Sequence, residues 1–238
     1  MKELNAVIQM NIWLIKNITN LTNNREMKGI MFTEDLFKQI INGNKTQTRR
    51  IFNWDRGCIT VDTVGFSCFT PKGKISIRGN TKNGQGEWFE KPRYMKGETI
   101  YLKEPYCISC DNHGGMSKKC CYLYATGFDK CTPCNPVWKN KMFMPESAAR
   151  YFIEITDVNV QRLQDITEED ARNEGVYFAK SPMGNCYLDY INGGCNILVS
   201  AYKSFRSLWR KINGNESWEL NPWVFIYKFK LINNTKTL

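Results

Sequence analysis

Apolar residues recur at helical spacing in two segments of the chain. In 34–41 they fall three and four positions apart, Thr33 just before is a good N-cap, and Gly43 just after is typical of a helix end. The segment 201–212 repeats this pattern with a broad aromatic face that includes Trp209. We therefore predict an amphipathic helix in each place, with its apolar face against a core.

Most of the remaining pattern predicts strands. Runs rich in β-branched and aromatic residues lie at 58–69, 74–79, 96–106, 122–126, 150–163 and 221–232. The Gly- and Asn-containing stretch 80–87 is predicted to be a loop, and a third, short helix is expected between Thr167 and Gly175. Many strands, few helices and short turns predict an α+β fold built on a small, largely antiparallel β-barrel or curled sheet.

The composition changes along the chain in a way that suggests boundaries. Residues 1–26 include an Asn- and Thr-rich run and are interpreted as an N-terminal extension, which leaves 27–232 as the domain proper. Two stretches within it, 107–140 and 176–199, look like insertions, and 233–238 is interpreted as a tail.

Charge narrows the set of partners. Lys plus Arg exceed Asp plus Glu by 33 − 23 = 10, which favours a polyanion such as nucleic acid, or an anionic substrate. No secretory signal and no run of membrane-spanning length is recognised in the sequence. We therefore expect a cytoplasmic protein that does not act on membranes.

Six of the ten cysteines lie in one of the insertions, 107–140. Cys107 and Cys110 form one Cys-x-x-Cys pair, and Cys131 and Cys134 form a second pair, with 20 residues between the two pairs. In a reducing compartment this spacing favours a four-thiolate structural zinc site. Nearby residues that are able to replace one of these ligands are His113, Cys120 and Cys121.

The run "GNKTQTRR" (43–50) follows the first helix and carries more polar groups than a turn needs. A lysine whose pKa is lowered by burial or by a neighbouring cation can act as a base, and Lys45 stands three residues before the hydroxyl of Thr48. In an extended strand these two side chains point to opposite faces, so their cooperation requires a turn or a corner. The alternative is a solvated polar turn.

Four stretches together resemble ASCH domains of the bacterial and phage type. They are "GNKTQTRR", "GETIYLKEPY", the run 143–176 with "LQDITEEDARNEG", and the run 208–229 with "NPWV". The likeness covers about 27–232 and is interrupted by the two insertions. It implies a PUA-like β-barrel and an association with RNA or modified nucleosides, and some members of the family are hydrolases or nucleases.

The resemblance also implies a set of catalytic residues. Small bacterial ASCH enzymes that deacetylate acetylcytidine have a lysine, a threonine and a glutamate that fall on Lys45, Thr48 and Glu174. The local spacing of these motifs is kept, while this chain is longer and has two insertions able to cover or reshape the cleft. We expect the three residues to meet at the open end of the barrel.

Four further residues are candidates for binding the substrate. Alternation along a strand predicts that Arg49 and Arg50 point to opposite faces, so that at most one lines the same cleft as Thr48 and binds a phosphate or carboxylate. By the same reasoning one of Lys103 and Glu104 points into the barrel mouth, where Glu104 is able to pair with Lys45 or Arg49. An ordinary edge-strand ion pair is the alternative.

Three functions compete at this point. The first is a hydrolase that acts on an amide of a modified cytidine or, as a ribonuclease, on a phosphodiester. The second is a non-catalytic module that binds RNA or DNA in the basic cleft and carries a structural zinc. The third is a phage protein that binds a host protein through its insertions.

Overall fold

The computed structural model describes residues 27–52, 58–65, 74–81, 84–109, 121–124, 138–181, 184–192, 197–198 and 200–232. The proposed extension 1–26 and tail 233–238 lie outside these residues. The α+β class predicted from the sequence is confirmed, because the described part combines four sheets with three α-helices.

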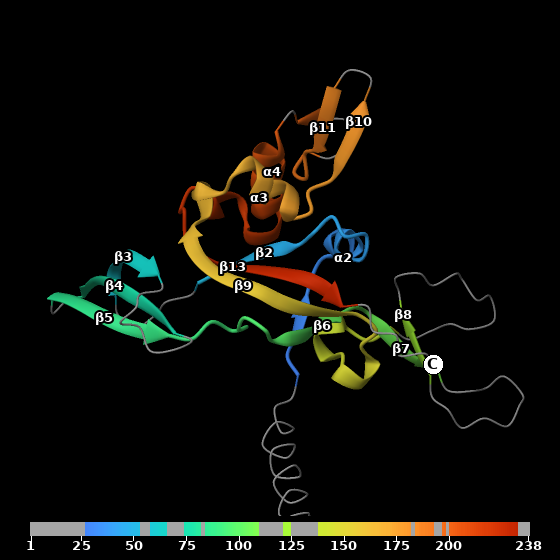
Figure 1. Cartoon of the computed structure of the whole chain (residues 1–238). Coiled ribbons are helices and arrows are strands. Elements are labelled where there is room, and N and C mark those ends of the chain that lie inside the picture. The colour runs from blue at the N-terminus through green and yellow to red at the C-terminus, as the bar shows by residue number, and fades with distance from the viewer. Residues whose placement is uncertain are drawn as a thin grey trace, which may run out of the picture.

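A five-stranded mixed sheet forms the centre of the molecule (Figure 1). Its strands, in spatial order, are β1 (Gly29–Met31), β6 (Thr99–Lys103), β9 (Phe152–Arg162), β13 (Trp223–Ile232) and β2 (Gln47–Ile51). β1 and β6 run parallel, and the other neighbours are antiparallel. The long strands β9 and β13 pair with each other in the interior of the sheet, and β1 and β2 are its two edge strands.

The closed barrel predicted from the sequence is not present in the described residues. The order of the strands begins at β1 and ends at β2, and no ladder joins these two edges. A single side chain links them instead, because Arg50 Nη2 of β2 donates to the Met31 carbonyl of β1 at 2.7 Å. The sheet is therefore open, with a seam between its two edge strands.

Three α-helices pack around this sheet, namely α2 (Glu34–Ile41), α3 (Glu168–Asn173) and α4 (Ala201–Asn213). The predicted N-caps are confirmed, because the side chain of Thr33 accepts from Leu36 N and that of Thr167 from Asp170 N. Short 3₁₀ turns occur at Lys141–Phe143, Glu146–Ala148, Leu163–Asp165 and Asn215–Ser217. Buried residues of α2, α4, β9 and β13 belong to one continuous hydrophobic core.

Three smaller sheets extend from the centre. They are β3 (Cys58–Gly65), β4 (Ile75–Thr81) and β5 (Gly84–Glu90); β7 (Tyr106–Ser109) and β8 (Cys121–Tyr124); and β10 (Phe178–Ser181), β11 (Gly184–Leu188) and β12 (Ile197–Leu198). The loop predicted at 80–87 is wrong for its described residues, because 80–81 end β4 and 84–87 begin β5. The ladder hydrogen bonds between β4 and β5 outweigh the low strand propensity of Asn80, Gly84 and Gly86. No described helix is long and apolar enough to cross a membrane.

Candidate functional site

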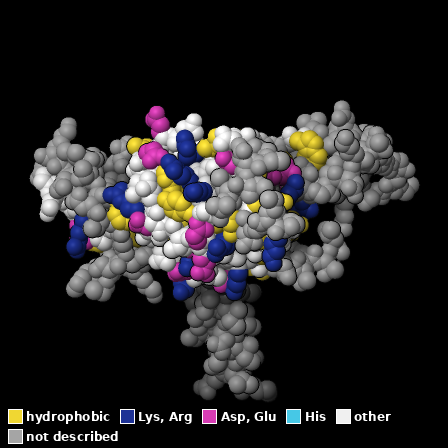
Figure 2. All heavy atoms as spheres, turned by 90° about the horizontal axis from the view of Figure 1, so that it is seen from above, with side chains coloured by type: hydrophobic (Ala, Val, Ile, Leu, Met, Phe, Trp, Pro, Cys, Tyr) yellow, Lys and Arg dark blue, Asp and Glu magenta, His cyan; other side chains and the backbone are white. Residues whose placement is uncertain are grey.

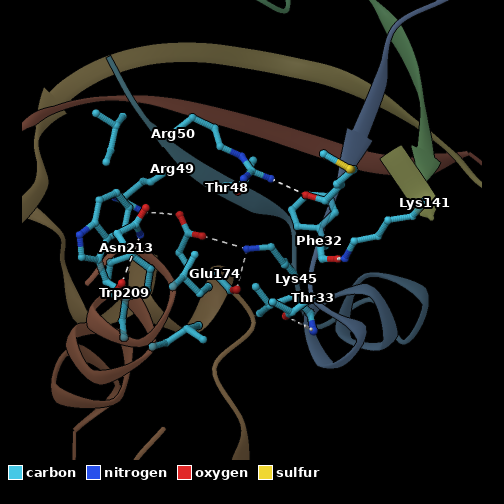
Figure 3. A pocket seen from close by; sticks show the side chains of 16 residues that line it. Phe32, Thr33, Lys45, Thr48, Arg49, Arg50, Lys141, Glu174, Trp209 and Asn213 are labelled. Atoms are coloured by element: carbon cyan, nitrogen blue, oxygen red, sulfur yellow. Dashed lines mark hydrogen bonds and ion pairs between the residues drawn. The ribbon is translucent and has the colours of Figure 1, made fainter. Parts of the chain in front are cut away.

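A pocket of about 310 Å³ opens at the seam between β1 and β2 (Figure 3). One wall comes from Met31 to Leu36 at the end of β1 and the start of α2, and another from the edge strand β2. α4 closes one end with Phe205, Leu208, Trp209, Ile212 and Asn213. The seam that keeps the sheet from closing is therefore a place where a small molecule has room.

Glu174 forms a buried ion-paired cluster with Lys45 and Arg49 in the pocket. Its Oε2 accepts from Lys45 Nζ at 2.8 Å and its Oε1 from Arg49 Nη1 at 2.9 Å, and all three side chains are buried. Lys45 Nζ also donates to the Glu174 carbonyl at 2.7 Å. The predicted meeting of Lys45 with Glu174 is confirmed, although they lie 129 positions apart.

Asp170 is a member of this cluster that the sequence analysis missed. Its Oδ2 accepts from Arg49 Nη2 at 3.0 Å, and Gln47 Nε2 donates to its backbone carbonyl at 2.9 Å. Asp170 stands four residues before Glu174, a separation that places both carboxyls on one side of α3 and its C-cap. The four-residue spacing between Asp170 and Glu174 is visible in the sequence and could have identified Asp170 as a neighbour of Glu174.

The backbone around Gly175 brings Lys45 into place. Lys45 and Glu174 form an isolated antiparallel bridge, and Thr46 N donates to the Asn173 carbonyl at 2.9 Å. Gly175 has φ +80°, and a Cβ built there would lie 2.7 Å from the Cβ of Lys45. A side chain at position 175 would therefore meet both backbone strain and a clash with the lysine.

The position of β2 explains why so many of its side chains reach one pocket. Thr48, Arg49 and Arg50 all line it, so the expectation that Arg49 and Arg50 diverge to separate sites is wrong. Alternation does place the side chains of Arg49 and Arg50 on opposite faces of the strand. However, β2 is an edge strand and the pocket lies beyond that edge, so side chains from both faces can line it. Lys45 joins them through the bridge before the strand rather than through a turn.

Burial lowers the pKa of Lys45 below its ordinary value, and the charges of Arg50 and Arg49 act in the same direction. Glu174 opposes this change. The lowering prevails because the burial of the amine outweighs its attraction to Glu174. Arg49 also pairs with Glu174, so the carboxylate keeps a cationic partner when Lys45 loses its proton. Lys45 also lies near an aromatic face, with Nζ 5.6 Å from the ring centroid of Phe32.

Thr48 is buried and lines the pocket. Its backbone pairs with Tyr227 of β13, which fixes the position of its Cα. Within the part of the chain that the structure describes, its hydroxyl has no hydrogen-bond partner. The Thr48 hydroxyl is therefore held at a fixed place in the pocket without a hydrogen-bond partner among the described residues.

Two buried N–H donors on the pocket walls also lack a partner among the described residues. They are Arg49 Nε and Trp209 Nε1. Trp209 was interpreted from the sequence only as a core residue, and its burial confirms this, but it also lines the pocket. An unsatisfied buried donor costs roughly 1–3 kcal/mol, so the pocket favours a ligand that carries acceptors.

Lys103 and Glu104 lie outside this pocket and line a smaller hollow of about 50 Å³ next to it. The buried Glu104 carboxylate accepts two hydrogen bonds from Arg150, at 2.7 and 2.8 Å, and the expected pairing with Lys45 or Arg49 is not found. Lys103 Nζ donates to the Met142 carbonyl at 2.8 Å. Lys45 and Arg49 pair instead with Glu174 and Asp170.

The zinc prediction falls largely outside the described residues. Cys107 is buried in β7, where its backbone pairs with Leu123, whereas Cys110, Cys131 and Cys134 are not among the described residues. Within the described part there is no group of three or more His, Cys, Asp or Glu side chains that is able to hold a metal ion.

On the face seen in Figure 2, the described Lys and Arg side chains are interspersed with Asp and Glu. This face therefore has no patch of a single charge sign among the described side chains, whereas four Lys and Arg residues line the pocket.

No protein-family model matches this chain, and no curated protein and no solved structure matches it either. The fold and the pocket therefore define a class only in general terms: an α+β protein with a buried Lys–Glu–Arg cluster at the open seam of its sheet.

Proposed function

We propose that this chain binds a modified cytidine in the seam pocket and hydrolyses an amide on the exocyclic amine of its base. One observation carries the proposal: Lys45, Thr48 and Glu174 line the same pocket. These are the positions on which the resemblance to ASCH deacetylases places the catalytic lysine, threonine and glutamate. The open five-stranded sheet is, in this proposal, a PUA-like barrel that remains unclosed at the substrate site.

Lys45 acts as the base. A neutral amine has two N–H groups and one lone pair, and its two hydrogen bonds to Glu174 account for both N–H groups. The lone pair is then left for the proton of the Thr48 hydroxyl. Glu174 and Arg49 hold the amine in this orientation, and the lowered pKa of Lys45 increases the fraction of neutral amine.

The reaction runs in two steps. Thr48 Oγ1 forms a bond to the amide carbonyl carbon while its proton moves to Lys45 Nζ. The carbon–nitrogen bond then breaks, the proton passes to the leaving amine, and cytidine departs from an acetyl ester of Thr48. Water hydrolyses this ester and releases acetate, with Lys45 again accepting and returning the proton.

The pocket suits such a ligand in size and polarity. Its volume of about 310 Å³ lies at the lower end of the range for small-molecule sites. The unpartnered N–H groups of Arg49 and Trp209 favour carbonyl acceptors, which a pyrimidine base and its acyl group both supply. Phe32 and Phe205 offer aromatic faces beside the cationic groups.

Incubation with N4-acetylcytidine is expected to yield cytidine and acetate, measured by chromatography. Lys45→Ala is expected to lower the rate by a factor of about 10²–10⁴, because general-base catalysis is lost. Lys38→Ala is the matched control, since Lys38 is exposed on α2 and pairs only with Glu34. Equal rates for the two variants would refute the role of Lys45.

The competing functions are separated in the same experiment. Cleavage of labelled RNA in place of deacetylation would favour a ribonuclease. Binding of RNA that weakens steeply with salt, without any product, would favour the non-catalytic module. A pull-down from host lysate tests the remaining possibility of a protein partner.

We also propose a structural zinc ion held by Cys107, Cys110, Cys131 and Cys134. The hairpin β7–β8 supports it, because Cys107 lies on a strand that pairs back within the Cys-rich insertion. Metal analysis of the purified protein is expected to find about one zinc per chain, and Cys110→Ser with Cys134→Ser to remove it. Cys186→Ser, a thiol in β11, is the control and should keep the metal. A wild-type protein purified without chelators that holds no zinc would contradict the proposal.

A further inference from the structure

Two cations of the seam pocket are not used by the proposed reaction. Arg50 and Lys141 line its wall on the side of Phe32, away from the end closed by Trp209 and Asn213 (Figure 3). Arg50 Nη2 donates to the Met31 carbonyl, and Lys141 Nζ donates to the Phe32 carbonyl. Arg50 also lies over the Phe32 ring, with its Cζ 5.2 Å from the ring centroid.

Neither cation has a carboxylate partner within the described part of the chain. The nearby Glu174 is already paired with Lys45 and Arg49, and Asp170 with Arg49. Burial lowers the pKa of Arg50, to which Arg93 contributes, and burial and the charge of Arg50 lower that of Lys141. The two groups are therefore close enough to repel each other. Glu174 attracts Arg50 without forming an ion pair with it, so this side of the pocket keeps an excess of positive charge.

We propose that Arg50 and Lys141 form a phosphate-binding subsite, so that this pocket binds a nucleotide more tightly than the free nucleoside. The inference rests on the proposed function for the position of the base. A planar guanidinium beside a flexible ammonium suits the oxygens of a phosphate, which accept from both at once. The phosphate then lies against Phe32, and the base extends past Glu174 towards α4.

The subsite also explains why Arg50 links the two edge strands. Its contact with the Met31 carbonyl keeps the guanidinium at the rim of the seam, where it remains able to donate through its other N–H groups. Lys141 approaches the same rim from the first 3₁₀ turn, on a separate segment of the chain. The anion is thereby held by groups from β2 and from the segment after the Cys-rich insertion.

Binding of cytidine and of cytidine 5′-monophosphate, measured by calorimetry at fixed salt, tests the proposal. Charged hydrogen bonds to the phosphate predict about tenfold or more tighter binding of the monophosphate to the wild type. Lys141→Gln and Arg50→Gln are each expected to reduce this preference by about tenfold. The 3′-monophosphate serves as a second arm, and a preference for either isomer over cytidine supports the subsite and identifies the phosphate that it takes.

Lys139→Gln is the matched control, because it removes the same charge from an exposed lysine two residues from Lys141. It should leave the preference for the monophosphate unchanged. Equal binding of cytidine and both monophosphates by the wild type would overturn the subsite, as would equal effects of Lys139→Gln and Lys141→Gln. A phosphate-dependent preference in a protein that hydrolyses no acetylated substrate would support the subsite and count against the proposed reaction alone.

Discussion

Replacing Glu174 by Gln is expected to lower the free energy of unfolding by about 3–5 kcal/mol, measured by urea denaturation at neutral pH. Glu174 is buried and its carboxylate accepts from Lys45 at 2.8 Å and from Arg49 at 2.9 Å. A neutral amide of the same shape takes the anion away from the protonated form of Lys45 and leaves Arg49 with Asp170 as its carboxylate partner. Lys45 is able to release its proton, so the larger part of the cost falls on Arg49. The loss arises mainly from buried positive charge that has lost its compensation.

The arrangement predicts that the two ends of the ion pair are not equivalent. Lys45→Met removes a cation but leaves Glu174 paired with Arg49, so its cost should be clearly smaller than that of Glu174→Gln. Combining the two changes should restore part of the loss, since the unpaired ammonium is then gone.

Glu169→Gln is the control for this series, because Glu169 is an exposed acid on the same helix α3. Its effect should stay within about 0.5 kcal/mol. A cost for Glu174→Gln as small as that of Glu169→Gln would show that the cluster is not a buried ionic network in solution.

Local chemistry in the sequence was sufficient to predict most of the elements that support the site. Thr33 and Thr167 mark the starts of α2 and α3 because a side-chain oxygen before an amphipathic run satisfies free N–H groups. The strands β9 and β13 are recognisable because β-branched and aromatic residues run through them, although buried and exposed positions alternate only in a short part of β13, from Tyr227 to Lys230. Each of these signals lies within about a dozen residues.

The state of the sheet was not predictable in the same way. Whether β1 and β2 close a barrel depends on how far the edges curl towards each other, and β1 is only three residues long. No local pattern specifies that gap. The resemblance to a barrel family pointed to closure, whereas the structure has a seam linked by Arg50.

The site was predicted through motifs and not through geometry. Lys45, Thr48 and Glu174 were identified by resemblance, and the expected turn at 45–48 proved to be a bridge before an edge strand. Asp170 was missed because an acid among several acids on one short helix has no distinguishing local signal apart from its spacing to Glu174. Lys141 was missed because its role depends on a fold that brings it to the carbonyl of Phe32.

Replacing Thr48 by Val is expected to lower the rate of deacetylation of N4-acetylcytidine by a factor of about 10³ or more, because the nucleophile is removed. The fold should hardly change. Valine has nearly the same shape, the hydroxyl has no partner within the described residues, and the backbone of position 48 keeps its pairing with Tyr227. Thr48→Ser is the matched variant, since it retains the hydroxyl while losing a methyl group, and it should keep most of the activity.

Rates alone do not separate attack by Thr48 from attack by a water molecule that Thr48 holds. The proposed route passes through an ester, so rapid mixing followed by mass spectrometry should detect one acetyl group on the peptide that contains Thr48. Thr48→Val should never carry it. If Thr48→Val kept more than about a tenth of the wild-type rate, the hydroxyl would be only part of the pocket wall. Lys45 and Glu174 would then have to activate water directly, and the Lys45→Ala variant would remain the more damaged of the two.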